Sequence, residues 1–226
     1  MLNLIPDFSS QQQPCMLFLG AHSDDIEIGC GATVLTLAHH YPHAKVDWVV
    51  FNADGGRLSE ARNSAKDFLS SFRESKIEVH QFRNAYFPSA FEEIKNAFEI
   101  LKNRISPNLI FTHHKDDRHQ DHRVIGEFTW NTFRDNVILE YEIPKFDGGL
   151  GDPNFFVDIT AERLQQKLDK LSEHFGSQAD KHWFSRDVFT ALMRLRSVEG
   201  NCESGFAEAF YCRKAALDFR ANNDRT

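Results

Sequence analysis

The sequence predicts an α/β fold, a Rossmann-like three-layer sandwich with a mostly parallel sheet. Short apolar runs alternate four times with segments of helical periodicity between residues 16 and 112, which is typical of βαβ units. Two dense polar clusters follow the first and the fourth apolar run. Because ligands bind beyond the carboxyl ends of the strands in such sheets, we expect a site at that edge.

The elements of the first half are predicted from their periodicity and their boundaries. Apolar runs bounded by turn formers predict strands, and apolar residues spaced by three or four positions predict helices. Pro107 separates the last of these helices from the strand that follows it. The expected order is strand 16–20, helix 29–38, strand 46–51, helix 58–72, strand 77–82, helix 90–105 and strand 109–112.

In the second half the alternation of strands and helices is less regular, and the connections between the expected elements are longer. A loop rich in glycine and proline, residues 148–153, separates two of its expected strands. No internal repeat, low-complexity tract or linker divides the chain, so residues 1–226 are expected to form one domain. The expected order is strand 139–143, strand 155–159, helix 161–175, helix 187–198, strand 207–213 and a frayed tail over residues 222–226.

Charge and composition argue against several classes of protein. The 26 basic and 33 acidic residues give a formal net charge of −7, so no nucleic-acid partner is expected. No stretch approaches the roughly 20 apolar residues of a transmembrane helix, and the first residues show no secretory signal. The four cysteines are therefore expected to be reduced thiols in a cytoplasmic protein. The second half is rich in aromatic residues that suit an interface between subunits, so the sequence does not exclude a homo-oligomer.

The two polar clusters carry the functional signal. The first is FLGAHSDDIEIGCGAT, residues 18–33, and the second is THHKDDRHQDHR, residues 112–123. If the strands that precede them are neighbours, both clusters share one crevice. Together they hold His22, Asp24, Asp25, His113, His114, Asp116, Asp117, His119, Asp121 and His122.

These residue types suit a catalytic divalent metal ion. Two imidazoles and one carboxylate leave an open coordination position, which is typical of catalytic zinc. His22 and Asp25 lie three residues apart on one turn, and His122 is placed to join them from the second cluster. Water bound to Zn²⁺ in such a set ionises near neutral pH. The expected cofactor is one Zn²⁺ per chain, with Fe²⁺ or another divalent metal as an alternative.

The remaining polar residues suit proton transfer. Asp24 is adjacent to a ligand without being one, so it is free to accept the proton of the attacking water. His119 precedes His122 by three residues, and on a helix both would share one face. His119 is then placed to stabilise an oxyanion or protonate a leaving amine, and Asp121 to orient an imidazole from the second shell.

The two motifs resemble those of a known family. AHSDD followed by IEIGCGAT, then HQDHR, and later SVEGNCESGFAEAF, are similar to the motifs of the LmbE-like, or PIG-L, zinc-dependent de-N-acetylases. The resemblance implies hydrolysis of an N-acetyl group on an amino sugar to give the free amine and acetate. It also implies the site residues by position: His22, Asp25 and His122 as metal ligands, Asp24 as general base, His119 as the group that assists the oxyanion and leaving group, and Asp121 as its motif neighbour.

The sequence departs from the family pattern at two positions. Ser23 stands where proline is usual, and Ala32 where glycine is common. Neither position supplies a ligand, so we expect a small change in loop stiffness. HQDHRVIGEFTWNTFRD and EYEIPKFDGGLG resemble the branch found among bacterial surface-polysaccharide genes. The substrate implied is a small-molecule or lipid-linked amino sugar, either free or on a nucleotide or lipid carrier.

Simpler interpretations compete with these. Residues 22–25 also fit a solvated turn in which aspartate caps a helix. Arg57 and Arg83 follow later strands at the same rim and are candidates for gripping substrate, although a solvated helix start explains Arg57 equally well.

Three other functions use the same residues. A dinuclear metallophosphoesterase would hold two metals about 4 Å apart with the excess carboxylates. A non-haem Fe²⁺ oxygenase also uses two histidines and one carboxylate, but gives Asp24 no task. A catalytically silent module that binds metal and sugar would have no use for Asp24 and His119, which are both present.

Overall fold

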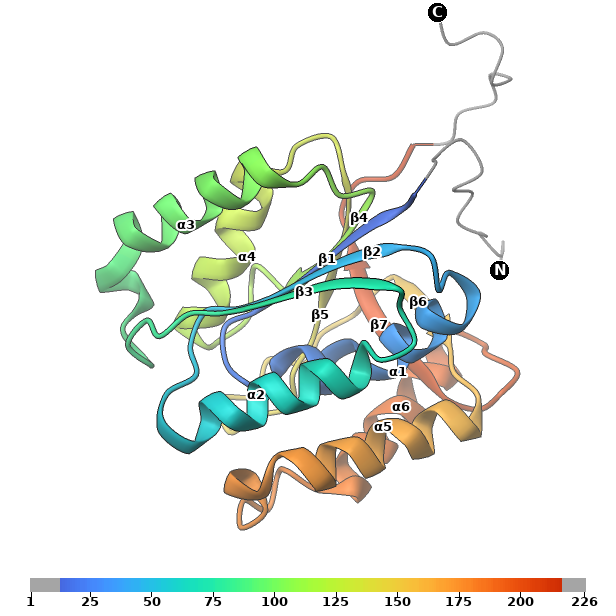
Figure 1. Cartoon of the computed structure of the whole chain (residues 1–226). Helices are drawn as coiled ribbons and strands as arrows, with labels where there is room; N and C mark the ends of the chain where they lie inside the picture. The colour runs from blue at the N-terminus through green and yellow to red at the C-terminus, as the bar shows by residue number, and fades with distance from the viewer. Residues whose placement is uncertain (1–12, 217–226) are drawn as a thin grey trace, which may run out of the picture.

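One seven-stranded mixed sheet forms the middle layer of the computed structural model, which describes residues 13–216 (Figure 1). The strand order is β3-β2-β1-β4-β5-β7-β6, and neighbours among the first five positions run parallel. β7 is antiparallel to both β5 and β6. The strands are β1 Cys15–Gly20, β2 Lys45–Val50, β3 Glu74–Val79, β4 Leu109–His113, β5 Val137–Tyr141, β6 Phe155–Asp158 and β7 Ala207–Cys212. The predicted α/β class with a mostly parallel sheet is confirmed.

Helices cover both faces of this sheet, which makes three layers (Figure 1). α3 and α4 lie on one face, and α1, α2, α5 and α6 lie on the other. Two short 3₁₀ helices, η1 Phe87–Ala90 and η2 Gly176–Gln178, complete the described chain. The α-helices are α1 Asp25–His40, α2 Gly55–Phe68, α3 Phe91–Arg104, α4 Gln120–Thr132, α5 Ala161–His174 and α6 Arg186–Glu199.

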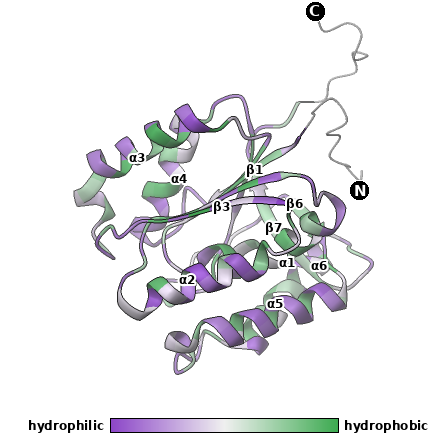
Figure 2. Cartoon of the chain, viewed as in Figure 1, coloured by the Kyte–Doolittle hydropathy of each residue, from purple (hydrophilic) through white to green (hydrophobic). Residues whose placement is uncertain are grey.

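The pleat of the central strands divides the core into two clusters. Met16 and Phe18 of β1 join the cluster under α1, α2 and α5, whereas Leu17 and Leu19 join the cluster under α3 and α4. All four side chains are fully buried, as expected for a parallel strand covered on both faces. In Figure 2 the outer helices α2 and α5 show hydrophilic and hydrophobic residues alternating along their length, as one-sided burial requires.

The first helix differs from its prediction. It begins at Asp25 instead of residue 29, and Cys30 within it has non-helical dihedral angles of φ −146° and ψ 19°. Glycine is a poor helix former, yet Gly29 and Gly31 both lie within α1 on either side of this break. In the structure, rings pack against both glycines, since a Cβ atom at Gly29 would lie 2.3 Å from the Tyr141 ring and one at Gly31 would lie 2.9 Å from the Phe68 ring.

Several other boundaries shift by a few residues. β3 begins three residues before its predicted start and ends at Val79, and β5 begins two residues early. α2 also begins and ends earlier than its apolar periodicity predicted, because Gly55 turns the chain into the helix with φ +51°. The expected frayed tail and the absence of a secretory signal concern segments that lie outside the described residues.

The cysteines are reduced in the structure, as the composition predicted. Cys15, Cys30, Cys202 and Cys212 are all free thiols. Within residues 13–216, no helix combines the length and apolar character that crossing a membrane requires.

Replacement of Gly29 by alanine tests the contact between α1 and β5. We expect Gly29→Ala to lower the free energy of unfolding by about 1–3 kcal/mol, since the added methyl overlaps the fully buried Tyr141 ring. Chemical denaturation measures the loss. Gly56→Ala is the matched control, because nothing lies within 4 Å of its Cβ position. Equal stability of the two variants would contradict the close approach.

Candidate active site

The parallel pairing of β1 with β4 brings the two polar clusters together. Their register places Phe18 beside Phe111, so the loops that follow both strands leave the same edge of the sheet. Two backbone contacts hold the first loop there: the Ala21 N–H donates to His113 Nε2 at 2.9 Å, and the Asn52 N–H donates to the Ala21 carbonyl at 2.8 Å. The assumption that strands one and four are neighbours is confirmed.

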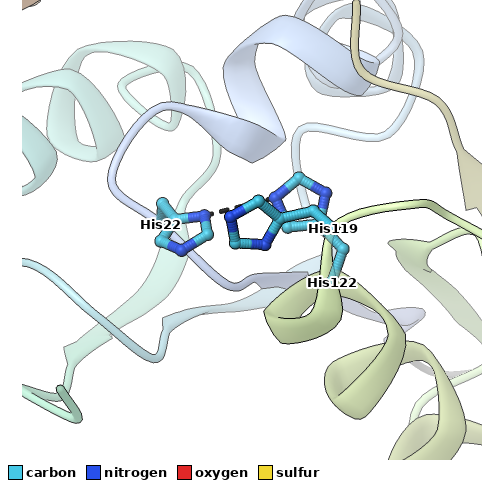
Figure 3. Close-up of side chains that lie close together, drawn as sticks. All are labelled: His22, His119 and His122. Atoms are coloured by element: carbon cyan, nitrogen blue, oxygen red, sulfur yellow. Dashed lines mark hydrogen bonds between the residues drawn. The ribbon is translucent and has the colours of Figure 1, made fainter. Parts of the chain in front are cut away.

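His22, Asp25 and His122 converge on one small volume. His22 Nδ1 lies 3.2 Å from His122 Nε2 and 3.3 Å from Asp25 Oδ2, and His122 Nε2 lies 3.6 Å from Asp25 Oδ1. All three residues are buried. Figure 3 shows the two imidazoles facing each other, with His119 beside them at the start of α4. The Asp25 carboxylate also accepts the His22 N–H at 2.6 Å, which closes the turn between them.

Carboxylates hold the outer nitrogen of each imidazole. His22 Nε2 lies 3.3 Å from Asp121 Oδ2, and His122 Nδ1 lies 3.1 Å from Asp117 Oδ2. Asp121 is itself fixed by the N–H groups of Ala85 and Phe87, at 2.7 and 3.1 Å. These partners assign the ring protons to the outer nitrogens, so His22 Nδ1 and His122 Nε2 carry lone pairs.

The convergent donor set fits a divalent cation. Two ring nitrogens that face each other at 3.2 Å require either a proton or a metal ion between them. The separations of 3.2–3.6 Å match the edges of a coordination shell with ligands about 2.1 Å from the ion. The carboxylate–imidazole pairs are the outer contacts that usually orient metal-bound histidines.

Two further histidines lie within reach of the same volume. The potential ligand atoms of His119 lie within 4.8 Å of those of His22 and His122, and those of His113 within 4.8 Å of Asp25 and His122. Both histidines already have a partner, however. His113 Nε2 accepts the Ala21 N–H, and His119 Nδ1 accepts the Asp121 N–H at 3.3 Å. The second contact assigns the His119 proton to Nε2.

Asp24 is adjacent to this set but faces a different partner. Its Oδ1 accepts the Arg57 guanidinium at 2.8 Å, and its buried Oδ2 has no hydrogen-bond partner among residues 13–216. Although Asp24 directly precedes α1, its side chain makes no capping hydrogen bond. The simpler interpretation, a solvated capping turn, is therefore wrong for Asp24, which is only 4% exposed.

Burial and neighbouring charges set the two adjacent carboxylates apart. Burial raises the pKa of Asp24 above its usual range, and Arg57 only partly opposes this. Burial also acts on Asp25, but the imidazoles of His122, His113 and His22 outweigh it and hold the pKa of Asp25 well below its usual range. Two neighbours in sequence are thereby suited to different tasks.

Comparison with known proteins identifies the family. The model of the PIG-L family, described as GlcNAc-PI de-N-acetylase, matches residues 17–133, which include both polar clusters. The chain belongs to the PIG-L family. A curated PIG-L relative, the uncharacterized deacetylase YaiS of Escherichia coli strain K12, is 30% identical over 177 residues, covering 74% of this chain and 93% of YaiS.

Solved structures share the fold at lower identity. The N,N'-diacetylchitobiose deacetylase of Pyrococcus horikoshii superposes with a TM-score of 0.68 and 19% identity, covering 88% of this chain and 84% of its own. GalB of Pseudomonas putida KT2440, a 4-carboxy-2-hydroxymuconate hydratase, superposes with a TM-score of 0.71 and 13% identity, covering 92% and 100%. The PIG-L architecture is therefore shared by enzymes of more than one reaction class.

The two predicted rim arginines take different places in this PIG-L chain. Arg57, from the first turn of α2, pairs with Asp24 and is not free at the rim. Arg83 is exposed and stacks on the Tyr86 ring, with its Cζ atom 3.6 Å from the ring centroid.

Sequence reasoning gave little weight to two groups at the site. His113 is the last residue of β4 and is fully buried, with Nε2 3.1 Å from Asp25 Oδ2. Lys145 donates to Asp117 Oδ2 at 2.7 Å and ties the loop after β5 to the partner of His122. His113 ends a strand beside the first motif, which is a usable signal, whereas no local pattern marks Lys145.

The Arg57–Asp24 pair is expected to matter for stability. In metal-free protein at neutral pH, Arg57→Met should cost about 1–3 kcal/mol, because it leaves a buried carboxylate without its partner. The loss should shrink below about pH 4, where Asp24 is protonated in the folded and unfolded states alike. Urea denaturation of Arg57→Met and of Asp24→Asn/Arg57→Met measures it. The double variant should recover most of the loss, and no recovery would contradict the pairing.

Proposed function

We propose that this protein is a metal-dependent hydrolase that removes the acetyl group from an N-acetylated amino sugar, giving the free amine and acetate. The observation that carries the proposal is the convergence of His22 Nδ1, Asp25 and His122 Nε2 within 3.2–3.6 Å, beside an Asp24 that is outside the set. Membership of a de-N-acetylase family supports the same reaction. The metal proposed is one Zn²⁺ per chain, and the donor set also suits Fe²⁺.

His22, Asp25 and His122 would hold the ion. A divalent ion there polarises the amide carbonyl and lowers the pKa of bound water. Asp121 and Asp117 keep the lone pairs of His22 and His122 directed inward, because each accepts the proton on the opposite ring nitrogen. Arg57 holds Asp24 Oδ1, which leaves Oδ2 free to take the proton of the attacking water.

His119 would stabilise the oxyanion, whereas Asp24 would activate the attacking water. Its Nδ1 accepts a backbone N–H, so the Nε2–H is available to donate to the oxyanion that develops on the amide oxygen. Burial, followed by the nearby His22, lowers the pKa of His119, which keeps the ring neutral at neutral pH. A neutral ring donates through Nε2–H, and the proton taken up by Asp24 is available for the leaving amine.

The substrate class rests on relatives. The Pyrococcus horikoshii protein is a deacetylase of N,N'-diacetylchitobiose, and the PIG-L model is described as GlcNAc-PI de-N-acetylase. Both names denote N-acetylated amino sugars, and we propose the same class for this chain. The carrier, whether none, a nucleotide or a lipid, is the variable to be tested, and Arg83 is a candidate rim contact.

A dinuclear phosphoesterase has weaker support. A second ion at the same edge would need its own ligands, yet the Asp25–His113–His122 group shares two residues with the first set, and His113 Nε2 is already an acceptor. Asp67, Glu173 and His174 form another acidic group between α2 and α5, but Lys170 Nζ already contacts Asp67 there. These arrangements favour one ion.

Acetate release and metal content test the proposal together. A panel of N-acetylglucosamine, its oligosaccharides and its nucleotide- and lipid-linked forms should include at least one substrate, and activity should vanish with a chelator and return with Zn²⁺. One metal equivalent per chain is expected, because the described ligands form a single set. Two equivalents with phosphate-ester hydrolysis would favour the phosphoesterase. Metal binding with no acetate released from any substrate would favour the catalytically silent module.

Asp24 separates metal binding from turnover. Asp24→Ala should keep one metal equivalent and lower kcat by about 10²–10⁴-fold, since it removes the proposed base without removing a ligand. Asp116→Asn is the control, because this aspartate lies in the second cluster but is exposed and pairs with Lys115 and His114, away from the proposed ligands. Normal turnover of Asp24→Ala would reject the assignment of the base.

A further inference from the structure

The break in α1 lies one helical turn beyond the proposed metal ligand Asp25. Cys30 interrupts the helix, so a first segment, residues 25–29, carries Asp25 and a second segment, residues 31–40, continues toward His40. In an unbroken helix, the N–H of residue 32 donates to the carbonyl of residue 28. The direction of the first segment therefore depends on what satisfies these two groups at the break.

A buried ion pair from distant parts of the chain satisfies both groups. Lys167 of α5 donates to the Ile28 carbonyl at 2.6 Å, and Glu208 Oε1 of β7 accepts the Ala32 N–H at 3.0 Å. Lys167 Nζ and Glu208 Oε1 are 2.6 Å apart, and each side chain is 2% exposed. Glu208 Oε2 also accepts the Thr33 N–H at 2.6 Å. The ion pair is thus inserted into the helix where one backbone hydrogen bond would otherwise form.

Each charge of the Lys167–Glu208 pair lies at the helix end whose dipole it complements. Lys167 lies at the carboxyl end of the first segment, where carbonyl groups point outward and a cation is favoured. Glu208 lies at the amino end of the second segment, where free N–H groups favour an anion. Either charge alone would be buried without its counter-ion, so the pair acts as one unit.

The first segment leads directly to the site. Tyr141 packs against Gly29 and donates from its hydroxyl to the Leu19 carbonyl at 2.6 Å, and Asp25 accepts the His22 N–H. The ion pair therefore fixes the far end of a five-residue segment whose near end carries Asp25. The mechanism proposed above has no role for either Lys167 or Glu208.

We infer that Lys167 and Glu208 are positioning residues for the metal site, which hold the break in α1 and thereby aim the Asp25 carboxylate at His22 and His122. Neither side chain contacts the proposed ligands, so they act through the backbone of residues 28–33. This inference rests on the proposed metal-dependent function.

The test compares two double variants in the full chain. Lys167→Met/Glu208→Gln removes the ion pair without leaving a buried unpaired charge, so it is the variant expected to fold. Asp47→Asn/Arg104→Met is the control, because it removes another partly buried pair, 3.0 Å apart, that joins β2 to the carboxyl end of α3 away from the metal set. Zn²⁺ affinity is measured by competition with a chromophoric chelator, the Co²⁺ absorption spectrum reports ligand geometry, and urea denaturation gives the stability of each.

Lys167→Met/Glu208→Gln is expected to bind Zn²⁺ at least tenfold more weakly, to alter the Co²⁺ spectrum, and to lower kcat more than it changes KM. The control is expected to lose stability while keeping affinity and spectrum. Unchanged affinity and spectrum in the first variant, or equal losses of affinity in both, would overturn the positioning role while leaving the proposed function standing. Failure of the unaltered protein to bind either metal would overturn both.

Discussion

The parallel hydrogen bonding between β1 and β4 is the constraint on which the site depends. The two polar clusters are separated by 78 residues in sequence, and the pairing of adjacent strands places both at one edge of the sheet. β1 and β4 are covered on both faces and largely apolar, so the carboxylates and imidazoles of the site lie at or beyond the points where these two strands end. The fold thereby concentrates seven buried carboxylates and imidazoles at this edge: His22, Asp24, Asp25, His113, Asp117, Asp121 and His122.

Such a concentration of buried polar groups is stabilised by the partners that most of them have. Asp121 and Asp117 accept from the outer nitrogens of His22 and His122, and two backbone N–H groups fix Asp121 in turn. Asp24 Oδ2 is an exception: like Ser23 Oγ and His113 Nδ1 it is buried without a partner among the described residues, while Asp24 Oδ1 is held by Arg57. A buried polar atom left unsatisfied costs stability, and under the proposed mechanism Asp24 Oδ2 is the atom that accepts the proton of the attacking water.

The sequence predicted what short motifs and the order of the strands determine, and missed long-range contacts of residues that no motif marks. Strand and helix order, the edge of the sheet that holds the site and the convergence of His22, Asp25 and His122 all followed from runs of about ten residues. The role of Arg57 depends on how Gly55 turns the chain into α2, and the Lys167–Glu208 pair joins residues 41 positions apart to a helix more than 130 positions away. The break at Cys30 could not be predicted from the spacing of apolar residues, because the glycines on either side of it are equally typical of an ordinary turn.

The fold alone does not decide the reaction, because an N,N'-diacetylchitobiose deacetylase and a 4-carboxy-2-hydroxymuconate hydratase both superpose on this chain. Each reaction activates a water molecule, and they differ in the group that the water adds to and in what leaves. Amide hydrolysis additionally requires a donor for the oxyanion and a proton for the amine. In the proposed mechanism His119 is that donor, and its protonated Nε2 follows from a single backbone contact, the Asp121 N–H donated to Nδ1. His119 and Asp121 both lie at the start of α4, so the proposed deacetylation depends on the first turn of that helix as well as on the shared sheet.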